Sequence, residues 1–432
     1  MGLSKTDMEV VVFWFRRDLR LEDNTGLNHA LASGLPVLPL FIFDDNILAE
    51  LPKNDARVAF IHQQLEKIDK ALKKKNSSLL CLKGTPEEVW YELTQTYEIA
   101  GVYTNKDYEP YARERDKAIK DLLVERCIDL YLFKDQVIFE ENEVVKDDGK
   151  PYTVYTPYNN KWLSHFDRNK VKPQTTTGNF VQETFEFPEM KELGFIPSNI
   201  EVKPYDLSQT SSYAKTRDYP AQDATSYLSP HLRFGTVSVR QVIAQLKNSD
   251  ATFLSELIWR EFFMQILFHF PHVVEGNFKP QYNGIEWRNN EAEFEKWCSG
   301  QTGYPMVDAG MRQLNQTGYM HNRVRMVVAS FLCKHLLVDW RWGEAYFAEK
   351  LLDYELASNN GNWQWAAGTG CDAAPYFRVF NPTEQIKKFD PKLEYIKKWV
   401  PELNDFSYPK PIVDHKMARE RAIETYRNGL NN

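Results

Sequence analysis

Three residues of chemical interest share one face of an apolar segment. Residues 253–270 are apolar nearly all the way round, which predicts a helix buried on most sides. Within it, Glu256, Trp259 and Arg260 fall at positions i, i+3 and i+4 and so lie side by side. One interpretation is a structural ion pair between Glu256 and Arg260 beside a core Trp. The other is a cleft in which Trp259 stacks on a flat ligand and Glu256, its pKa raised by burial, donates a hydrogen bond.

A second group of polar residues lies within 320–326. On a helix, Asn322, Arg323, Arg325 and Met326 crowd one side. One interpretation is a solvated basic face. The other is a nucleobase pocket, because an amide can read base edges and Arg can bind phosphate.

Two further segments suit ligand binding. Residues 352–365 combine four amide side chains with two tryptophans, which favours a site over core packing. Trp363 and Trp365 are two residues apart, so we expect one to face the interior and the other a cleft. The hydroxyls of residues 225–229 precede a helical stretch and suit either an N-cap or a phosphate site.

The elements that must position these residues begin with an alternating pattern. Apolar runs at 10–15, 36–43, 78–82, 101–104 and 130–133 alternate with charged helical stretches at 55–75, 85–97 and 111–124. Strands that alternate with helices predict βαβ units and a parallel sheet. The glycine-rich dinucleotide fingerprint is absent after the first run, so we do not predict a NAD-type site.

The pattern changes twice further along the chain. A stretch rich in Pro, Asn, Thr, Lys and Glu predicts a long surface connection and a domain boundary. Beyond it the chain is helical throughout, including 310–338, 343–352 and 415–427. We therefore predict an α/β domain with a parallel, Rossmann-like sheet at 8–138, an interdomain linker at 139–204, and a larger all-α catalytic domain at 205–432.

Composition excludes several classes of protein. With 432 residues, 43% hydrophobic and 26% charged, the chain is typical of a globular protein. No apolar run approaches the ~20 residues of a membrane helix. The five scattered cysteines form no CxxC pair, which favours a reduced, cytoplasmic protein without a zinc or other metal site. The net charge of −7 means that nucleic acid would have to meet a local basic patch. The 14% aromatic content, with 11 Trp, suits a flat cofactor, base stacking or electron hopping.

Taken together, these segments resemble the photolyase/cryptochrome family. The similarity covers nearly the whole chain, through motifs at 14–20, 225–235, 302–305, 320–326, 359–365 and 389–390. Within the family the chain is most similar to the class I cyclobutane pyrimidine dimer photolyases, because Asn322 stands where members acting on (6-4) photoproducts typically carry a His.

The resemblance implies an FAD bound in the helical domain. It implies that the phosphates and ribityl chain are held by Tyr213, Thr225, Ser226, Tyr227, Leu228 and Ser229. Arg325 and Asp353 are expected to form an ion pair beside the isoalloxazine, with Asn359 near flavin N5. Glu355 stands where the family often has Asp. Plant-type cryptochromes usually place Asp at the position of Asn359 and animal ones often Cys, so Asn favours repair with a reduced flavin.

The same resemblance implies a pocket for a flipped pyrimidine dimer in damaged DNA. Its expected lining is Glu256, Trp259, Asn322, Arg323, Met326 and Trp365. The two tryptophans are expected to sandwich the dimer, while Glu256 binds a pyrimidine carbonyl and supports the radical anion. Phosphate contacts are expected from Arg217, Arg260, Arg323 and Arg378. The tryptophans that match the family's electron-transfer chain are Trp363, Trp340 and Trp287.

The activity implied is light-driven cyclobutane splitting by excited reduced FAD, in a monomer. The first domain resembles the family's antenna domain. Folate-binding members usually place Asn-Glu where this chain has Tyr111 and Ala112, so a flavin or deazaflavin antenna is favoured over folate. The alternatives are a signalling cryptochrome, a DASH-type enzyme acting on single strands, and a nucleotide-dependent enzyme of the first domain alone. Trp259 and Trp365 argue against the DASH type. The tryptophan-rich half of the chain argues against a nucleotide-dependent enzyme of the first domain alone.

Overall fold

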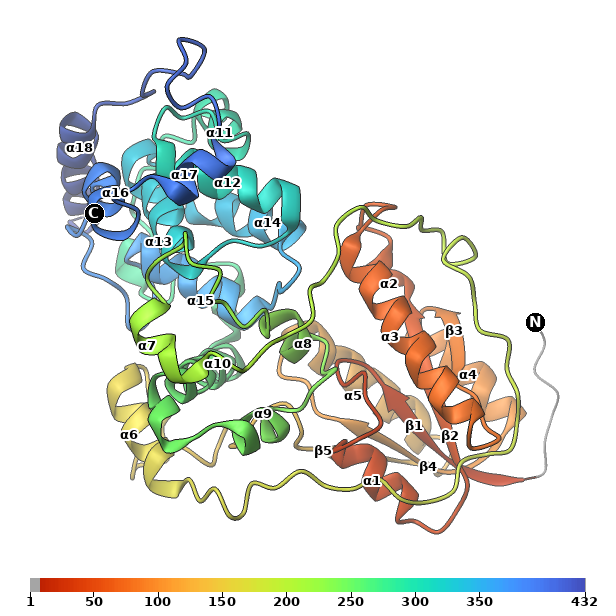
Figure 1. Ribbon diagram of the computed structural model, residues 1–432. Helices are drawn as coiled ribbons and strands as arrows, with labels where there is room; N and C mark the ends of the chain where they lie inside the picture. Colours follow the sequence, from red (N-terminus) through yellow and green to blue (C-terminus); the bar gives the residue numbers. More distant parts are fainter. Residues whose placement is uncertain (1–7, 432) are drawn as a thin grey trace. The chain divides into compact units, whose positions relative to one another are not determined.

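The computed structural model describes residues 8–431, which form two compact units. The sheet unit contains the chain up to Glu143, His165–Tyr205 and Leu228–Leu246. The helical unit contains Val144–Ser164, Asp206–Tyr227 and the chain from Lys247 onward. Each unit is therefore built from segments that lie far apart in the sequence (Figure 1).

The sheet unit is organised around five parallel strands in the order β3-β2-β1-β4-β5. The strands are β1 (Glu9–Phe15), β2 (Val37–Asp44), β3 (Leu80–Gly84), β4 (Glu98–Asn105) and β5 (Asp129–Phe133). In register, Val11 of β1 lies opposite Val37 of β2 and Gly101 of β4. The predicted parallel sheet is confirmed, and its strands fall within a few residues of the predicted apolar runs.

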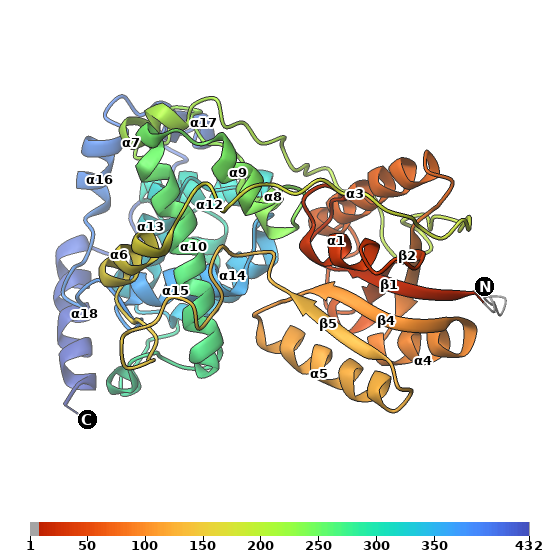
Figure 2. The same cartoon turned by 90° about the horizontal axis from the view of Figure 1, so that it is seen from below.

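Helices cover both faces of this sheet (Figure 2). They are α1 (Thr25–Leu31) and α3 (Ala56–Lys73) on one face and α4 (Pro86–Thr96) and α5 (Pro110–Val124) on the other. The sheet unit also contains α2 (Asp45–Leu48), α8 (Ser229–Arg233) and α9 (Val239–Gln245). Alternate residues of β1 point to opposite faces. Phe13 packs with the core under α1 and α3, whereas Trp14 packs with the core under α4 and α5. Burial on both faces explains why the strands are continuous apolar runs.

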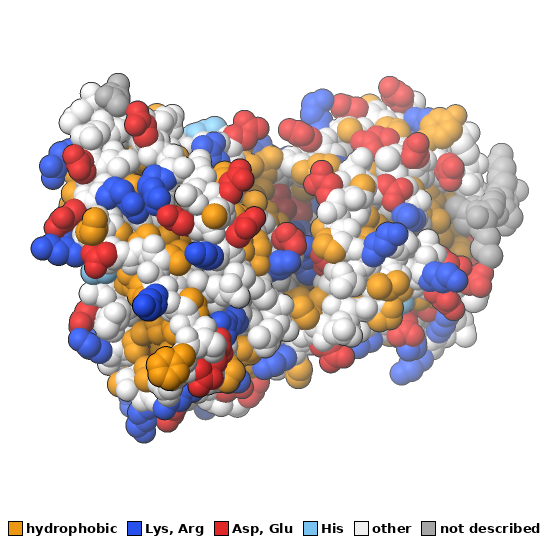
Figure 3. All heavy atoms as spheres, turned by 90° about the horizontal axis from the view of Figure 1, so that it is seen from above, with side chains coloured by type: hydrophobic (Ala, Val, Ile, Leu, Met, Phe, Trp, Pro, Cys, Tyr) orange, Lys and Arg blue, Asp and Glu red, His pale blue; other side chains and the backbone are white. Residues whose placement is uncertain are grey.

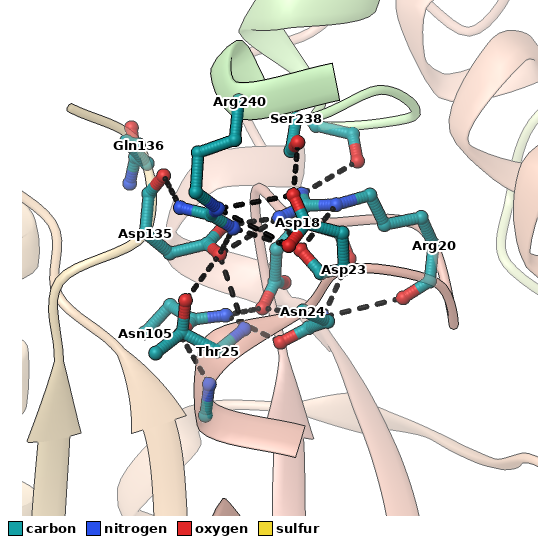
Figure 4. A network of polar contacts seen from close by, with 12 residues as sticks. Asp18, Arg20, Asp23, Asn24, Thr25, Asn105, Asp135, Gln136, Ser238 and Arg240 are labelled. Carbon is teal, nitrogen blue, oxygen red and sulfur yellow. Dashed lines mark hydrogen bonds and ion pairs between the residues drawn. The ribbon is translucent and has the colours of Figure 1, made fainter. Parts of the chain in front are cut away.

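A buried ion-pair network ties α9 to the end of the sheet (Figure 4). Asp135 binds Arg20 at 2.6 Å and Arg240 at 2.7 Å, and Asp23 binds Arg240 at 3.0 Å. Asp23 also accepts a hydrogen bond from Ser238, the N-cap of α9. Burial acts to raise the pKa of Asp135, but Arg20 and Arg240 outweigh it and hold that pKa at about 2. The network thereby fixes a segment remote in sequence within the sheet unit.

The helical unit consists of helices and their connections. They are α6 (Tyr155–His165), α7 (Tyr213–Thr216), α10 (Ala251–His269), α11 (Glu291–Cys298), α12 (Pro305–Thr317), α13 (Asn322–Ser330), α14 (Trp340–Lys350), α15 (Leu356–Ala367), α16 (Pro382–Phe389), α17 (Glu394–Trp399) and α18 (His415–Gly429). Its main core contains Trp297, Trp340 and Trp363. The predicted all-α class of this part is confirmed. In the described part of the chain, no helix is long and apolar enough to cross a membrane.

Two predictions, one of an unbroken helical stretch and one of a linker, differ from the structure. The predicted helical stretch 310–338 is broken, because α12 ends at Gly318 in the left-handed conformation (φ 69°), where glycine carries no steric penalty. The segment predicted as a linker contains α6, whose Tyr155, Tyr158 and Trp162 are buried within the helical unit. Apolar residues spaced three and four apart within a polar stretch were enough to build this helix. The domain bounds at 138 and 205 stay a prediction.

We predict that Asp135→Asn lowers the free energy of unfolding by about 3–5 kcal/mol, because it leaves two buried guanidinium groups without their shared carboxylate. The pKa of Asp135 is depressed in the folded protein, so its contribution is present above pH 3.8 and is lost as the pH falls towards about 2. Urea unfolding of the full chain should show a difference between wild type and variant that shrinks over that range. Asp121→Asn, which removes one exposed carboxylate paired with Lys117, is the control and should cost less than about 1 kcal/mol.

Candidate functional site

Between residues 253 and 267 of α10, Trp259 lies on the one strip that is not buried. Residues 255, 256, 259 and 260 are partly exposed, whereas the rest of the helix beyond residue 260 is mostly buried. The Trp259 ring stacks on the Tyr155 ring at 3.6 Å with an interplanar angle of 7°. Phe262 and Phe263 pack against the same indole. The ring is thus held in one orientation, with one face covered by Tyr155.

Glu256, one turn before Trp259, is paired with a residue from outside its own helix. Its carboxylate accepts a hydrogen bond from Arg217 at 2.6 Å. Burial raises the pKa of Glu256, and Arg217 opposes that rise. The alternative of a structural pair between Glu256 and Arg260 is therefore wrong: the carboxylate binds Arg217, beside α7, and Arg260 lies half-buried on α10.

The second candidate group begins α13. His321 is the N-cap and accepts a hydrogen bond from the Arg323 backbone; burial lowers the pKa of His321 to about 4, so the ring is neutral at pH 7. Arg323 binds Asp218 at 2.6 Å and lies over the Phe389 ring at 4.3 Å. Asn322 is exposed, and Met326 is half-buried.

Arg325 and Asp353 form the expected ion pair. The Arg325 guanidinium binds the Asp353 carboxylate at 2.9 Å and also donates to the backbone oxygen of Met320 at 2.8 Å. The Asp353 side chain is 8% exposed and that of Arg325 26%, so the pair presents its cationic side to solvent. Such a cation can bind a carbonyl or anionic edge of a ligand.

Helix α15 carries the amide-rich segment. The Asn359 amide donates to the backbone oxygen and to the carboxylate of Glu344, both at 3.0 Å. Both of its N–H groups are therefore engaged, and its carbonyl oxygen is directed away from Glu344. Trp363 is buried and Trp365 is partly exposed, as their spacing predicts. A Cβ at Gly361 would lie 2.2 Å from Phe263, so only glycine permits this close approach of α15 to α10.

The remaining candidates are distributed over several segments. Tyr213 begins α7 and packs its ring on Phe253 at 5.2 Å. Thr225, Ser226 and Tyr227 belong to the helical unit, whereas Leu228 and Ser229 open α8 in the sheet unit. Tyr227 adopts φ 52°, a left-handed conformation that costs a non-glycine residue energy and is concentrated at functional sites. Glu355 is buried and accepts a hydrogen bond from Ser358, and Arg378 is exposed, over Phe380.

The three predicted electron-transfer tryptophans have different surroundings. The ring neighbours of Trp363 are Phe347 at 5.0 Å and Trp297 at 6.1 Å. Trp340 donates to Asn277 at 2.9 Å, and Trp287 contacts Tyr426 at 5.8 Å. Their order as a chain stays a prediction.

Sequence reasoning missed four partners of the site. Trp259 stacks on Tyr155, and Asn359 donates to Glu344. Arg323 binds Asp218 and lies over Phe389. Each of the four comes from a different element than its partner, so no spacing rule within one helix connects them. Two of the four carried a signal: Asp218 as a charged neighbour of Arg217, and Phe389 as part of the motif at 389–390.

The residues fit a flavin better than a metal ion. An ion pair with an open cationic side, an oriented amide carbonyl and partly exposed aromatic rings match the polar edge and flat rings of a flavin. Within residues 8–431, no three His, Cys, Asp or Glu side chains are grouped so as to hold a metal. Acidic and basic side chains are interspersed over the face seen in Figure 3.

Comparison with known proteins agrees with this arrangement. Residues 11–177 match the family described as DNA photolyase, and residues 253–407 match the FAD binding domain of DNA photolyase. The chain is 38% identical to the deoxyribodipyrimidine photo-lyase of Halobacterium salinarum, over 96% of this chain and 98% of that one. It is 36% identical to the deoxyribodipyrimidine photo-lyase of a Synechococcus species, over 96% of both chains.

Solved structures agree as well. A bacterial class III photolyase from Agrobacterium tumefaciens superposes with a TM-score of 0.89 at 34% identity, over 99% of both chains. An archaeal photolyase from Sulfolobus tokodaii with two FAD molecules gives 0.86 at 38% identity, over 98% of this chain and all of the other. The sheet unit and the helical unit with its flavin-type site define a two-domain flavoprotein. The chain belongs to the DNA photolyase family, and it is an FAD-dependent lyase of DNA repair.

We predict that Arg217→Gln raises the pKa of Glu256 further, because Arg217 is the cation that opposes the effect of burial. The measurement is a pH titration of the carboxyl infrared band in protein with isotope-labelled glutamate. Glu344 is the internal control, since burial raises its pKa too while its partner is Asn359. An unchanged titration of Glu256 would contradict the role given to Arg217.

Proposed function

We propose that this chain splits cyclobutane pyrimidine dimers in DNA, in a pocket lined by Trp259, Trp365, Glu256, Asn322, Arg323 and Met326. The observation that carries the proposal is the fixed, partly exposed Trp259 ring with Glu256 one turn away on the same helix. A flat ring offers stacking to a base, and a carboxyl group offers a hydrogen bond to its edge. Extruding a damaged dinucleotide costs only a few kcal/mol, which contributes to selectivity.

FAD is the cofactor, and when bound in its reduced, light-excited form it supplies the electron that opens the cyclobutane ring. We assign its binding to Tyr213, Thr225, Ser226, Tyr227, Leu228, Ser229, Arg325, Asp353, Glu355 and Asn359. The carbonyl oxygen of Asn359 is an acceptor suited to an N–H donor of the flavin ring, because Glu344 engages both N–H groups of the amide. Such an acceptor favours the reduced ring, which carries that proton.

Protein side chains supply position and electrostatics around the dimer. Trp259 and Trp365 hold the bases, and Glu256 binds a pyrimidine carbonyl. Burial favours the protonated, donating form of Glu256 once Arg217 turns to DNA. Arg217, Arg260, Arg323 and Arg378 are the proposed phosphate contacts, which fix the register of the duplex without reading its sequence. Trp363, Trp340 and Trp287 are proposed to carry electrons to an oxidised flavin.

We propose a flavin or deazaflavin as the antenna of the sheet unit. The archaeal relative with two FAD molecules is described as implying a novel light-harvesting cofactor, which supports a flavin over folate. We further propose a monomer in a reducing, cytoplasmic compartment. The five cysteines are free in the described chain, which supports that compartment.

A second candidate is a cryptochrome-type photoreceptor. The cryptochrome of Synechocystis superposes with a TM-score of 0.84 at 25% identity, over 98% of this chain. A DASH-type enzyme acting on single strands is a third. The three candidates differ in the DNA that they repair: both strand forms, single strands alone, or none. One repair assay therefore distinguishes them.

The decisive experiment is a repair assay with chemically reduced, FAD-loaded protein. The substrate is an oligonucleotide with one cyclobutane thymine dimer, offered as single and as double strand, under blue light and in darkness. Light-dependent loss of the dimer in both strand forms is the expected result. Repair of single strands alone would favour the DASH type, and a flavin-loaded protein that repairs neither would favour the photoreceptor.

We predict that Trp259→Ala weakens dimer binding by about 1–3 kcal/mol, the usual value of one stacked base. Fluorescence anisotropy with the dimer oligonucleotide measures the loss. Trp259→Phe keeps a stacking ring and should retain most of the affinity. Trp399→Phe, a half-buried Trp on α17, should change nothing. Equal affinity in wild type and Trp259→Ala would remove Trp259 from the site.

A further inference from the structure

Two consecutive residues bind two of the three helices that carry the proposed dimer pocket. Arg217 binds Glu256 of α10 at 2.6 Å, and Asp218 binds Arg323 of α13 at 2.6 Å. One short segment after α7 therefore bridges both helices through ion pairs of opposite polarity. In each pair, the Arg is a proposed phosphate contact and its partner is a carboxylate of the protein.

Arg323 makes two interactions, an ion pair with Asp218 and a contact with the Phe389 ring. The ion pair is the one in which another anion can replace the partner. Arg323 donates from Nε at 3.2 Å and from Nη2 at 2.6 Å to the same oxygen of Asp218. The Asp218 side chain is 40% exposed, so solvent and anions reach it. The Arg323 guanidinium also lies over the Phe389 ring, and Lys388 lies over that ring at 5.1 Å. Arg323 and Lys388 thus both lie over the Phe389 ring, and Asp218 is bound to Arg323.

We propose that Asp218 occupies the place of a DNA phosphate on Arg323 and is displaced when DNA binds. This inference rests on the proposed function, since it takes Arg323 as a phosphate contact. The Arg323 guanidinium lies 4.3 Å from the centre of the Phe389 ring, a cation–π contact that keeps it in place when the carboxylate gives way. Asp218 keeps Arg323 ordered before binding, and it lowers affinity because its ion pair must be broken.

The exchange has a consequence for salt dependence. A phosphate neutralised by a free arginine releases a condensed counterion. A phosphate that displaces Asp218 leaves a bare carboxylate near the DNA, which attracts cations from solution and offsets part of that release. Removing the charge of Asp218 should therefore make the slope of log K against log salt steeper, by at most about 0.9, the value for one released ion.

The experiment compares the FAD-loaded full chain and its Asp218→Asn variant. Anisotropy with a short duplex, undamaged or with one thymine dimer, gives the dissociation constants between about 50 and 200 mM salt. We expect Asp218→Asn to bind both duplexes about two- to fivefold more tightly, the value of a partly exposed ion pair, with the steeper slope. A purely structural role for Asp218 would weaken binding instead, and that result, or an unchanged slope, would overturn the proposal.

Two controls separate this inference from the proposed function. Asp206→Asn removes an equal charge from an exposed residue bonded to Ser208, and it should leave the slope unchanged. In an Arg323→Gln background, Asp218→Asn should no longer tighten binding, because the two residues act through one contact. If Arg323→Gln alone leaves DNA affinity unchanged, the phosphate role of Arg323 fails. If it weakens binding while Asp218→Asn has no effect, only the role of Asp218 fails.

Discussion

The burial of α10 is the constraint on which the catalytic half of the protein depends. The helix is surrounded on most of its length, and Gly361 lets α15 approach it to contact with Phe263. Between residues 253 and 267, only 255, 256, 259 and 260 are partly exposed, and these include Glu256, Trp259 and Arg260. Packing thereby selects which side chains of an almost wholly apolar helix are available for chemistry.

Around that strip, charges are balanced by residues from other elements. Glu256 is held by Arg217, Arg323 by Asp218, and Arg325 by Asp353. In a protein with a net charge of −7, Arg217, Arg323 and Arg325 are thus each held by one carboxylate. The proposed DNA phosphates would compete for Arg217 and Arg323, because a phosphodiester offers anionic acceptor oxygens with the same single charge as a carboxylate.

Much of the fold followed from patterns within single segments. Alternating apolar runs and periodic helices predicted the parallel sheet, and the spacing of Trp363 and Trp365 predicted their opposite environments. Helix α6 and the break at Gly318 were missed although each has a local signal: apolar residues three and four apart within a polar stretch, and a glycine at the end of α12. The assignment of residues 228–246 to the sheet unit depends on Arg240 reaching Asp23 and Asp135, a contact between charges more than a hundred residues apart.

The sequence by itself determined the class of each half and the family, since periodicity and motif spacing can be read along the chain, and it named the residues that we propose bear the chemistry. Tertiary structure alone decided their partners. Tyr155 covers Trp259, Glu344 orients Asn359, and Asp218 holds Arg323. The reason is physical: stacking and ion pairing act over a few ångströms in space, and only the packed chain brings such distant residues that close.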